Sequence, residues 1–291
     1  MLYIVVFARF AEEFIDWAKR HEALSNLRPR MQLVALVEEN VEASSLSHAS
    51  GVRPDLCISG KRMVERINAL GSHVGRGGYI LVCACDDDIL KLQVPNDELG
   101  ARWLGLHPTA YFGSNFRPAI SNQIFKDLSH PSDPSDRLRR YFRCPFPGDN
   151  SIFYGLFVFE KWFETFHWAA SQIGGIENCE SFHAFDWLWM SRLIYLAPLH
   201  KPTDRLVIRR AENNWKKYHD IDDCRDTDFV LNNPLWPLIK TLHRAYPDVH
   251  LKNQLYSWLA VKVRERCKLT GEEAPNSASL KEQFLEGLKT H

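Results

Sequence analysis

The sequence predicts an α/β protein in which a mostly parallel sheet is flanked by helices and followed by a helical C-terminal part. Up to residue 90, short apolar runs alternate with amphipathic segments, which is typical of parallel strands joined by crossover helices. The apolar run 79–85 leads directly into three aspartates at 86–88, as expected where a strand reaches the carboxyl edge of an open sheet. Beyond residue 150 the apolar positions follow helical spacing.

The first part of the chain contains four apolar runs of strand length and two longer amphipathic segments. In both longer segments apolar residues recur at intervals of three and four, as on one face of a helix. The pair Gly77-Gly78 marks a turn before the last apolar run. The expected strands are 2–7, 31–37, 56–58 and 79–85, and the expected helices are 11–24 and 61–74.

After the aspartates the pattern changes and becomes more helical. Pro198 closes one strongly apolar segment, because proline does not continue a helix. Residues 211–228 are polar and charged. The expected elements are a helix at 97–104, a strand at 110–113, a polar proline-bearing loop at 129–136, a largely helical stretch at 152–173, a buried helix at 185–197, helices over 236–267 and a last short helix after 270.

The composition is that of an ordinary globular protein. The 291 residues include 36 lysines and arginines and 36 aspartates and glutamates, so the formal net charge is zero and a general nucleic-acid binder is disfavoured. The seven cysteines form no pair of CxxC motifs, which favours buried thiols in a reducing compartment over a zinc site. The apolar N-terminus lacks a basic leader region and no apolar run spans a membrane, so we expect a cytoplasmic protein.

Asp86, Asp87 and Asp88 form the most informative motif of the chain. Three adjacent negative charges repel one another, so we expect a cationic partner, and oxygen ligands suit Mg²⁺ or Mn²⁺ shared with substrate phosphates. Asp86 and Asp88 are two residues apart and would project to the same side of an extended chain, with Asp87 facing the other way. The alternative is that the triplet caps a following helix.

The segment GGYILVCACDDD at 77–88, preceded by a helix that carries Asn68, resembles the nucleotide-sugar half of GT-A-fold glycosyltransferases. A second stretch, DNSIFYG at 149–155, is similar to the NSxFYG segment of bacterial family-2-like enzymes from surface-polysaccharide gene clusters. The resemblance covers roughly residues 1–210, assigned to a GT-A-like Rossmann-type domain, with 211–291 as a helical extension packed on it. It implies metal-dependent, inverting transfer of a sugar from a nucleotide-sugar donor to a glycan or lipid-linked glycan acceptor.

The resemblance implies a divalent ion and a donor site. Asp86 and Asp88 would hold Mn²⁺ or Mg²⁺, which acts as a Lewis acid on the departing diphosphate. His219, in the late cluster HDIDD, would be a further metal ligand, and a solvated charged loop is the alternative. Donor-binding residues are expected at strand ends and on the helix before the triplet, with solvation or local capping as the alternatives. They are Phe7, Glu38, Arg62, Arg66, Asn68 and Asp87.

An inverting transferase also needs a base that takes the proton of the acceptor hydroxyl. Asp186, in the segment FHAFDW at 182–187, takes the place where the resembled enzymes have an acidic residue ahead of a helix, so it is the first choice. Glu180 is the second choice. The usual ED pair is Phe185-Asp186 here, and the alternative for Asp186 is that it caps the following helix.

Residues 153–168 are dense in aromatic side chains, and most are expected in the core. Trp162 or Trp168 would alternatively form an acceptor-sugar platform or a patch resting on the inner face of the membrane. Two other functions stay open. A nucleotidyltransferase would normally carry a basic Gly-rich phosphate loop near its N-terminus, and none follows Phe7. A nucleotide-binding GT-A-like protein without turnover is consistent with the altered ED pair.

Overall fold

The computed structural model describes residues 1–27, 30–38, 46, 54–74, 77–93, 104–119, 122, 133–143, 150–182, 184–200, 205–211, 233, 235–271 and 273–289. The expected helix at 97–104 lies outside these residues except for its last position. The polar stretch 211–228, which contains His219, lies outside them except for its first position.

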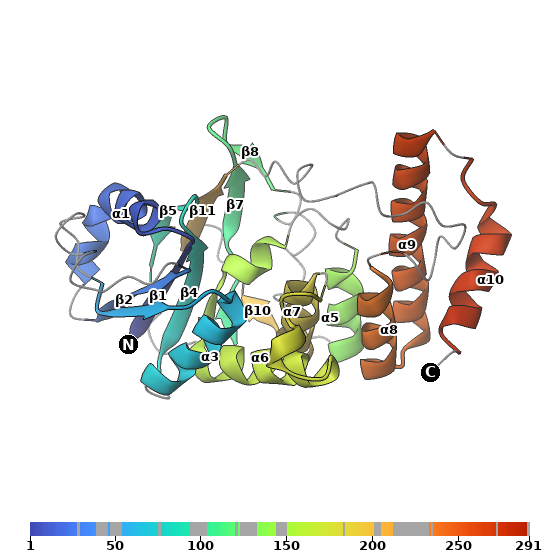
Figure 1. The fold of residues 1–291 in the computed structure, drawn as a ribbon, viewed down its shortest axis with the longest axis horizontal. Coiled ribbons are helices and arrows are strands. Elements are labelled where there is room, and N and C mark those ends of the chain that lie inside the picture. The colour runs from blue at the N-terminus through green and yellow to red at the C-terminus, as the bar shows by residue number, and fades with distance from the viewer. Residues whose placement is uncertain are drawn as a thin grey trace.

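The main sheet has seven strands and is mostly parallel (Figure 1). Its order is β10 (Leu199–His200), β6 (Gly105–Leu106), β9 (Leu156–Val158), β4 (Tyr79–Ala84), β1 (Leu2–Ala8), β2 (Met31–Val37) and β3 (Leu56–Ser59). Within these strands only β9 runs antiparallel to its neighbours, β4 and β6. The predicted strands near the N-terminus and the α/β class with a mostly parallel sheet are confirmed.

A second, smaller sheet lies beside the carboxyl end of β4. Its order is β5 (Asp88–Leu92), β11 (Leu206–Arg210), β7 (Thr109–Phe112) and β8 (Arg117–Pro118). β7 matches the strand expected at 110–113, whereas β5 and β11 were not anticipated. The chain passes from β4 into β5 through a turn at Cys85 and Asp86, so the aspartate triplet joins the two sheets.

Helices cover both faces of the main sheet, because strand residues alternate between two apolar cores. Tyr3 and Val5 of β1 face the core beneath α3 (Met63–His73) and α6 (Phe159–Gln172). Ile4 and Val6 face the other core, which α1 (Ala11–Arg20) closes with Phe14. Figure 1 shows α1 above the sheet and α3 and α6 below it. This two-sided burial explains why the strands read as continuous apolar runs.

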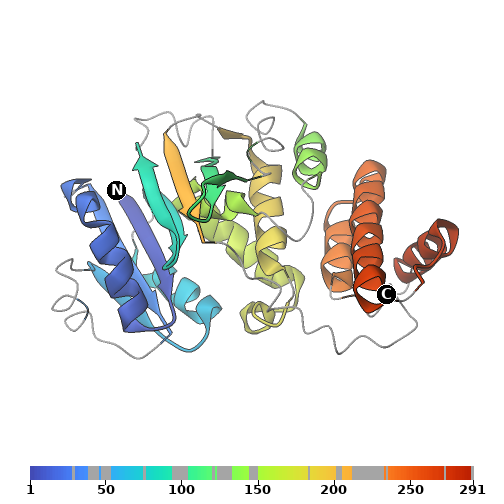
Figure 2. The same ribbon diagram turned by 90° about the horizontal axis from the view of Figure 1, so that it is seen from above.

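The helical part is centred on α7 (Phe185–Leu196), which packs against α5 (Pro134–Tyr141), α6 and α8 (Trp236–Ala245). α9 (Val249–Thr270) contacts α5 and α8, and α10 (Ser277–Gly287) packs on α9, at the end of the molecule far from α1 (Figure 2). None of the described helices is both long and apolar enough to cross a membrane.

One expectation about local structure needs correction, and another is confirmed with an added detail. The polar loop at 129–136 was expected to be irregular, but α5 begins within it at Pro134, where Asp133 caps the helix by accepting a hydrogen bond of 3.1 Å from the Asp136 amide. Proline suits the first turn of a helix, since its missing N–H has no partner to lose there. The stretch 152–173 is helical over much of its length, as expected: residues 152–154 belong to a short helix and residues 159–172 form α6, while Leu156–Val158 between them pair with β4 and β6 as β9.

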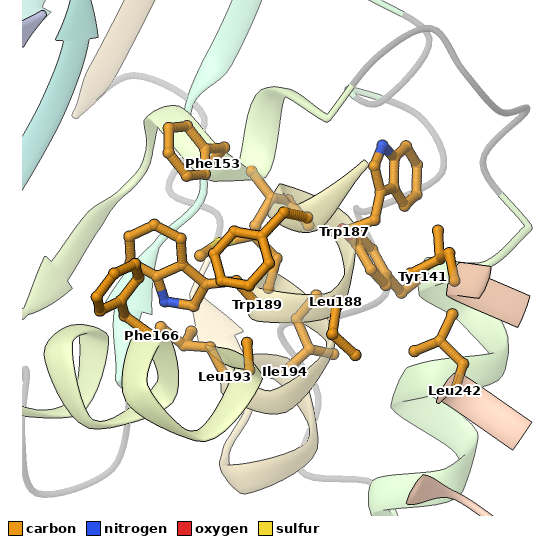
Figure 3. Close-up of a cluster of buried hydrophobic side chains, with 14 of the residues drawn as sticks. Tyr141, Phe153, Phe166, Trp187, Leu188, Trp189, Leu193, Ile194 and Leu242 are labelled. Carbon is orange, nitrogen blue, oxygen red and sulfur yellow. The ribbon is translucent and has the colours of Figure 1, made fainter. Parts of the chain in front are cut away.

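Aromatic residues of α6 and α7 form a dense core, as expected for most of them (Figure 3). Trp162 is fully buried, with its ring centroid 4.3 Å from that of Trp189. An acceptor platform at Trp162 is therefore ruled out by burial. Trp168 is half-buried, and the Arg192 guanidinium lies 4.9 Å over its ring, so this face of Trp168 is covered by the protein itself.

Candidate functional site

The aspartate triplet lies at the carboxyl edge of the main sheet, as the sequence predicted. Its conformation differs from the expected one. Cys85 and Asp86 form a turn, and Asp88 is already the first residue of β5. The three residues are therefore not one extended segment, so the expectation that Asp86 and Asp88 project to the same side does not follow. Of the three side chains, only Asp86 is exposed.

Asp88 is held by two arginines from distant segments. Arg209 of β11 donates from Nε to Asp88 Oδ2 at 2.8 Å, and Arg20 at the end of α1 donates to Oδ1. His21 Nε2 lies 4.0 Å from the same Oδ1. A buried carboxylate enclosed by two guanidinium groups has its charge compensated by the protein. The structure therefore gives Asp88 a role in joining α1, β5 and β11.

Asp87 is buried beneath the turn. Its Oδ2 accepts a hydrogen bond of 3.2 Å from the Ala84 amide, and its Oδ1 lies 3.9 Å from Nε of Arg210. The Asp87 carbonyl accepts a 3.0 Å hydrogen bond from the Trp17 indole, which ties the turn to α1. Burial raises the pKa of Asp87 to about 6, and Arg210 acts in the opposite direction. Asp87 therefore faces Arg210, away from the surface.

Arg210, at the end of β11, is the residue that sequence reasoning missed. Its guanidinium carbon lies 4.1 Å over the Tyr154 ring and 5.5 Å over the Phe112 ring. Burial raises the pKa of Tyr154 to about 12; Arg210 opposes this shift, and Asp86, Asp87 and Asp186 add to it. These interactions place one buried cation among the acidic residues. The available signal was the apolar run 206–208 ending in two arginines.

Asp186, the expected base, is fixed by a chain of hydrogen bonds. The Asn150 amide donates to Asp186 Oδ2 at 2.7 Å, and the Tyr141 hydroxyl donates to Asn150 Oδ1 at 3.0 Å. The second bond fixes the orientation of the amide, so its N–H faces the carboxylate. Burial raises the pKa of Asp186, and the bond from Asn150 and the charge of Arg210 oppose the rise.

The short helix η3 (Ser151–Tyr154) connects the two halves of the site, because it packs against both β4 and α7. Asn150 precedes it and reaches Asp186, whereas Tyr154 ends it and lies under Arg210. Packing of α7 fixes this arrangement: the Trp187 ring lies 5.0 Å from Tyr141, and Trp189 lies 5.4 Å from Phe153 (Figure 3). The NSxFYG-like segment thus brings the triplet and Asp186 into one site.

Arg66 forms a second polar position near the same edge of the sheet. Its side chain is buried, and Nη1 donates to the Gly60 carbonyl at 2.9 Å. Its Nε is buried and has no hydrogen-bond partner among the residues that the structure describes. Burial lowers the pKa of Arg66, while the charges of Glu38 and Glu180 oppose that change, so these acids lie near the guanidinium. A buried donor without a partner is costly, so this N–H is a candidate contact for a ligand.

The remaining candidates are distributed around this edge. Arg62 donates to Glu180 at 3.4 Å, and Glu180 also accepts a 3.4 Å hydrogen bond from the Val64 amide in the first turn of α3. These two residues therefore tie α3 to the segment before α7. Asn68 and Glu38 are exposed. Phe7, in β1, is half-buried and packs against the core beneath α3 and α6. The two candidate bases therefore have different hydrogen-bond donors. Glu180 accepts from the backbone of α3, and Asp186 accepts from the side chain of Asn150.

The residues expected to hold a divalent ion do not form a paired-carboxylate site. Asp88 is bound by Arg20 and Arg209, and Asp87 is buried against Arg210, which leaves Asp86 as the exposed carboxylate. Within the described part of the chain, no group of three or more histidine, cysteine, aspartate or glutamate side chains is arranged to hold a metal. The described carboxylates therefore do not fit the ion that the resemblance implied, and His219, the third expected ligand, lies outside the described residues.

No protein-family model matches this chain, and no curated protein matches it either.

Proposed function

We propose that this protein is a glycosyltransferase of the GT-A type that moves a sugar from a nucleotide-sugar donor to a glycan or lipid-linked glycan acceptor. The observation that carries the proposal is the position of η3. Through Asn150 it holds the Asp186 carboxylate, and through Tyr154 it supports Arg210 beside Asp87. A half-buried base and a charged carboxyl edge of a parallel sheet are thus parts of one site.

The proposed reaction is a single displacement at the anomeric carbon of the donor sugar. The acceptor oxygen forms a bond to that carbon while the bond to the diphosphate oxygen breaks, and the electron pair of the broken bond stays on the diphosphate. The acceptor proton passes to Asp186, whose pKa is raised by burial, which makes its carboxylate a stronger base than an exposed aspartate. Attack opposite the leaving group inverts the configuration of the anomeric carbon.

In this proposal the donor nucleoside binds at the carboxyl ends of β2 and β3. Arg66 offers a buried N–H without a partner in the described residues, and the exposed Glu38 lies near it. Polar groups at carboxyl strand ends commonly contact the ribose or base of nucleotides. A divalent ion, when bound, would supply Lewis-acid stabilisation of the diphosphate. Because the described carboxylates do not fit it, the proposed steps use only side chains of the protein.

The experiment is a thermal-shift screen of nucleotide sugars and nucleoside diphosphates, followed by product analysis with surface-polysaccharide acceptors. A ligand that binds only the folded state raises the melting temperature. At a ligand concentration about a hundred times its Kd, the free energy of unfolding increases by about 2.7 kcal/mol. We expect one nucleotide to shift the melting temperature and the matching sugar to be transferred. Asp186→Asn should abolish transfer, and Glu160→Gln, an exposed acid in the first turn of α6, should not.

Binding without transfer to any acceptor, and without hydrolysis of the donor, would instead support a nucleotide-binding protein without turnover. Incorporation of the nucleotide itself into a product would support a nucleotidyltransferase. No binding across the panel would contradict the proposal.

A further inference from the structure

The acidic triplet already has cationic partners within the chain. Three adjacent aspartates suggest a strongly negative site that needs a metal. The described site, however, holds four carboxylates, from Asp86, Asp87, Asp88 and Asp186, together with three arginines. Arg20 and Arg209 pair with Asp88, and Arg210 lies beside Asp87. Most of the negative charge that would repel a diphosphate is therefore compensated before any ligand arrives.

Arg210 differs from the other two arginines in its surroundings. Arg20 and Arg209 both direct donors at one carboxylate, and each is about one-third or more exposed, at 41% and 34%. The Arg210 side chain is only 10% exposed and lies over the Tyr154 ring. Charge interactions in such a position are screened less by water than those at the surface. Arg210 is thus the cation with the strongest expected effect within the site.

We infer that the nucleoside diphosphate binds here without a divalent ion, and that Arg210 supplies the positive charge beside its phosphates. The inference rests on the proposed function and concerns how that function handles the leaving group. It follows from a disagreement between the expected metal site and the observed contacts. Asp88, one of the two carboxylates expected to recruit an ion, already has two arginine partners, and Asp87 lies beside a buried one, which leaves Asp86 as the exposed carboxylate of the triplet.

In the transfer step, Arg210 acts on the charge that develops as the bond from the sugar to the diphosphate breaks. The electron pair of that bond remains on a diphosphate oxygen, and a fixed cation stabilises this charge without solvent reorganisation. Tyr154 restrains the guanidinium from one face, and Asp87 lies 3.9 Å from its Nε. The proton of the acceptor still passes to Asp186, so no further reactant is required.

The experiment measures binding of UDP, GDP and dTDP to the full chain by calorimetry, first in excess EDTA and then with saturating Mn²⁺. We expect at least one of these probes to bind in EDTA with a Kd within about threefold of its value with Mn²⁺, a difference below 1 kcal/mol. Arg210→Gln should weaken that binding at least about tenfold in EDTA, and Arg210→Lys should keep most of it because the charge is retained.

Arg117→Gln is the matched control. Arg117 lies over the same Phe112 ring, at 5.7 Å, but it is exposed on the edge strand β8, so its removal should not change Kd. Near-ultraviolet circular dichroism checks that each variant is folded. The wild-type comparison needs no variant, so it tests the inference even where Arg210→Gln unfolds.

Three outcomes would overturn the inference. Binding that appears only with Mn²⁺ would show that an ion is required and would leave the glycosyltransferase proposal intact. Equal affinity in folded Arg210→Gln and wild type would remove Arg210 from the phosphate site. No binding of any nucleotide in either condition would contradict both the inference and the proposed function.

Discussion

The side-chain amide of Asn150 donates a hydrogen bond of 2.7 Å to the carboxylate of Asp186. This contact joins the start of η3 to the first turn of α7, and Tyr141 completes it from α5. A carboxylate half-buried at this position gains from a donor, since an unsatisfied charge withdrawn from water is costly. The contact therefore both stabilises the local structure and orients the group that we propose as the base.

Asn150→Ala should shift the pH profile of transfer. The base acts when ionised, so activity falls as the pH drops through the Asp186 pKa. Burial already raises that pKa and the Asn150 bond opposes the rise, so removing the bond should move the acidic limb of the profile to higher pH. Asn178→Ala, which removes an exposed amide bonded to the Ile173 carbonyl, is the control and should leave the profile unchanged. An unshifted limb in Asn150→Ala would argue against Asp186 as the base.

Asp186→Asn should lose activity while keeping or gaining stability at pH 7. A carboxyl whose folded pKa is raised destabilises the fold at pH values above that pKa, because burial opposes its ionised form. The neutral amide removes this cost, and the loss of turnover then reflects chemistry alone. Denaturant unfolding of both proteins at pH 7 measures the first effect. A strongly destabilised variant would instead indicate that Asp186 is a structural cap.

Asp88→Asn should destabilise the protein by about 2–4 kcal/mol, because Arg20 and Arg209 lose their shared counter-charge while both remain partly solvated. Asp86→Asn, two residues earlier and exposed, should change stability by less than about 0.5 kcal/mol. Urea unfolding with both variants makes the comparison. Equal, small effects would contradict a structural role for Asp88.

Glu180→Gln should leave transfer activity near the wild-type level. Glu180 bonds to Arg62 and to the amide of Val64, so its loss removes a partly exposed ion pair worth about 0–1 kcal/mol. Initial rates at saturating donor and acceptor are the measurement. A fall of a hundredfold or more, with normal folding, would restore Glu180 as a catalytic candidate.

His21 should make stability depend on pH. Its Nε2 accepts a 2.9 Å hydrogen bond from the Ile89 amide and its Nδ1 donates to the Trp17 carbonyl at 2.8 Å, so the ring is neutral in the fold. Burial lowers its pKa below the ordinary 6.5. The stabilisation is therefore complete above about pH 6.5 and is lost as the pH falls through the lowered value.

His21→Gln tests this dependence against His250→Gln, an exposed histidine in the first turn of α9. As the pH falls from 7 to 5, the free energy of unfolding of His21→Gln should approach that of the wild type. For His250→Gln, the difference from the wild type should stay the same over this range. Parallel curves for both variants would show that His21 does not titrate differently in the folded state.

Sequence patterns predicted the parallel strands β1, β2 and β4 and the helices α1, α3 and α7, because apolar periodicity is a local property that burial imposes on each element. They also placed the aspartate triplet at the carboxyl edge of the sheet. Candidate roles for Asp86 and Asp186 stay predictions that the experiments above address. β9 and β11 escaped prediction, since short strands in a helical or charged context depend on their partners.

Tertiary structure alone decided what the triplet contacts. Asp88 meets Arg20 across 68 residues of sequence and Arg209 across 121, and Asn150 meets Asp186 across 36. Local patterns report which residues are buried, but the compensation of a charge depends on which distant segments fold against it. Local sequence patterns are sufficient to predict an α/β protein with acidic residues at a sheet edge. The arginines from α1 and β11 that surround these residues follow from the packing of distant segments.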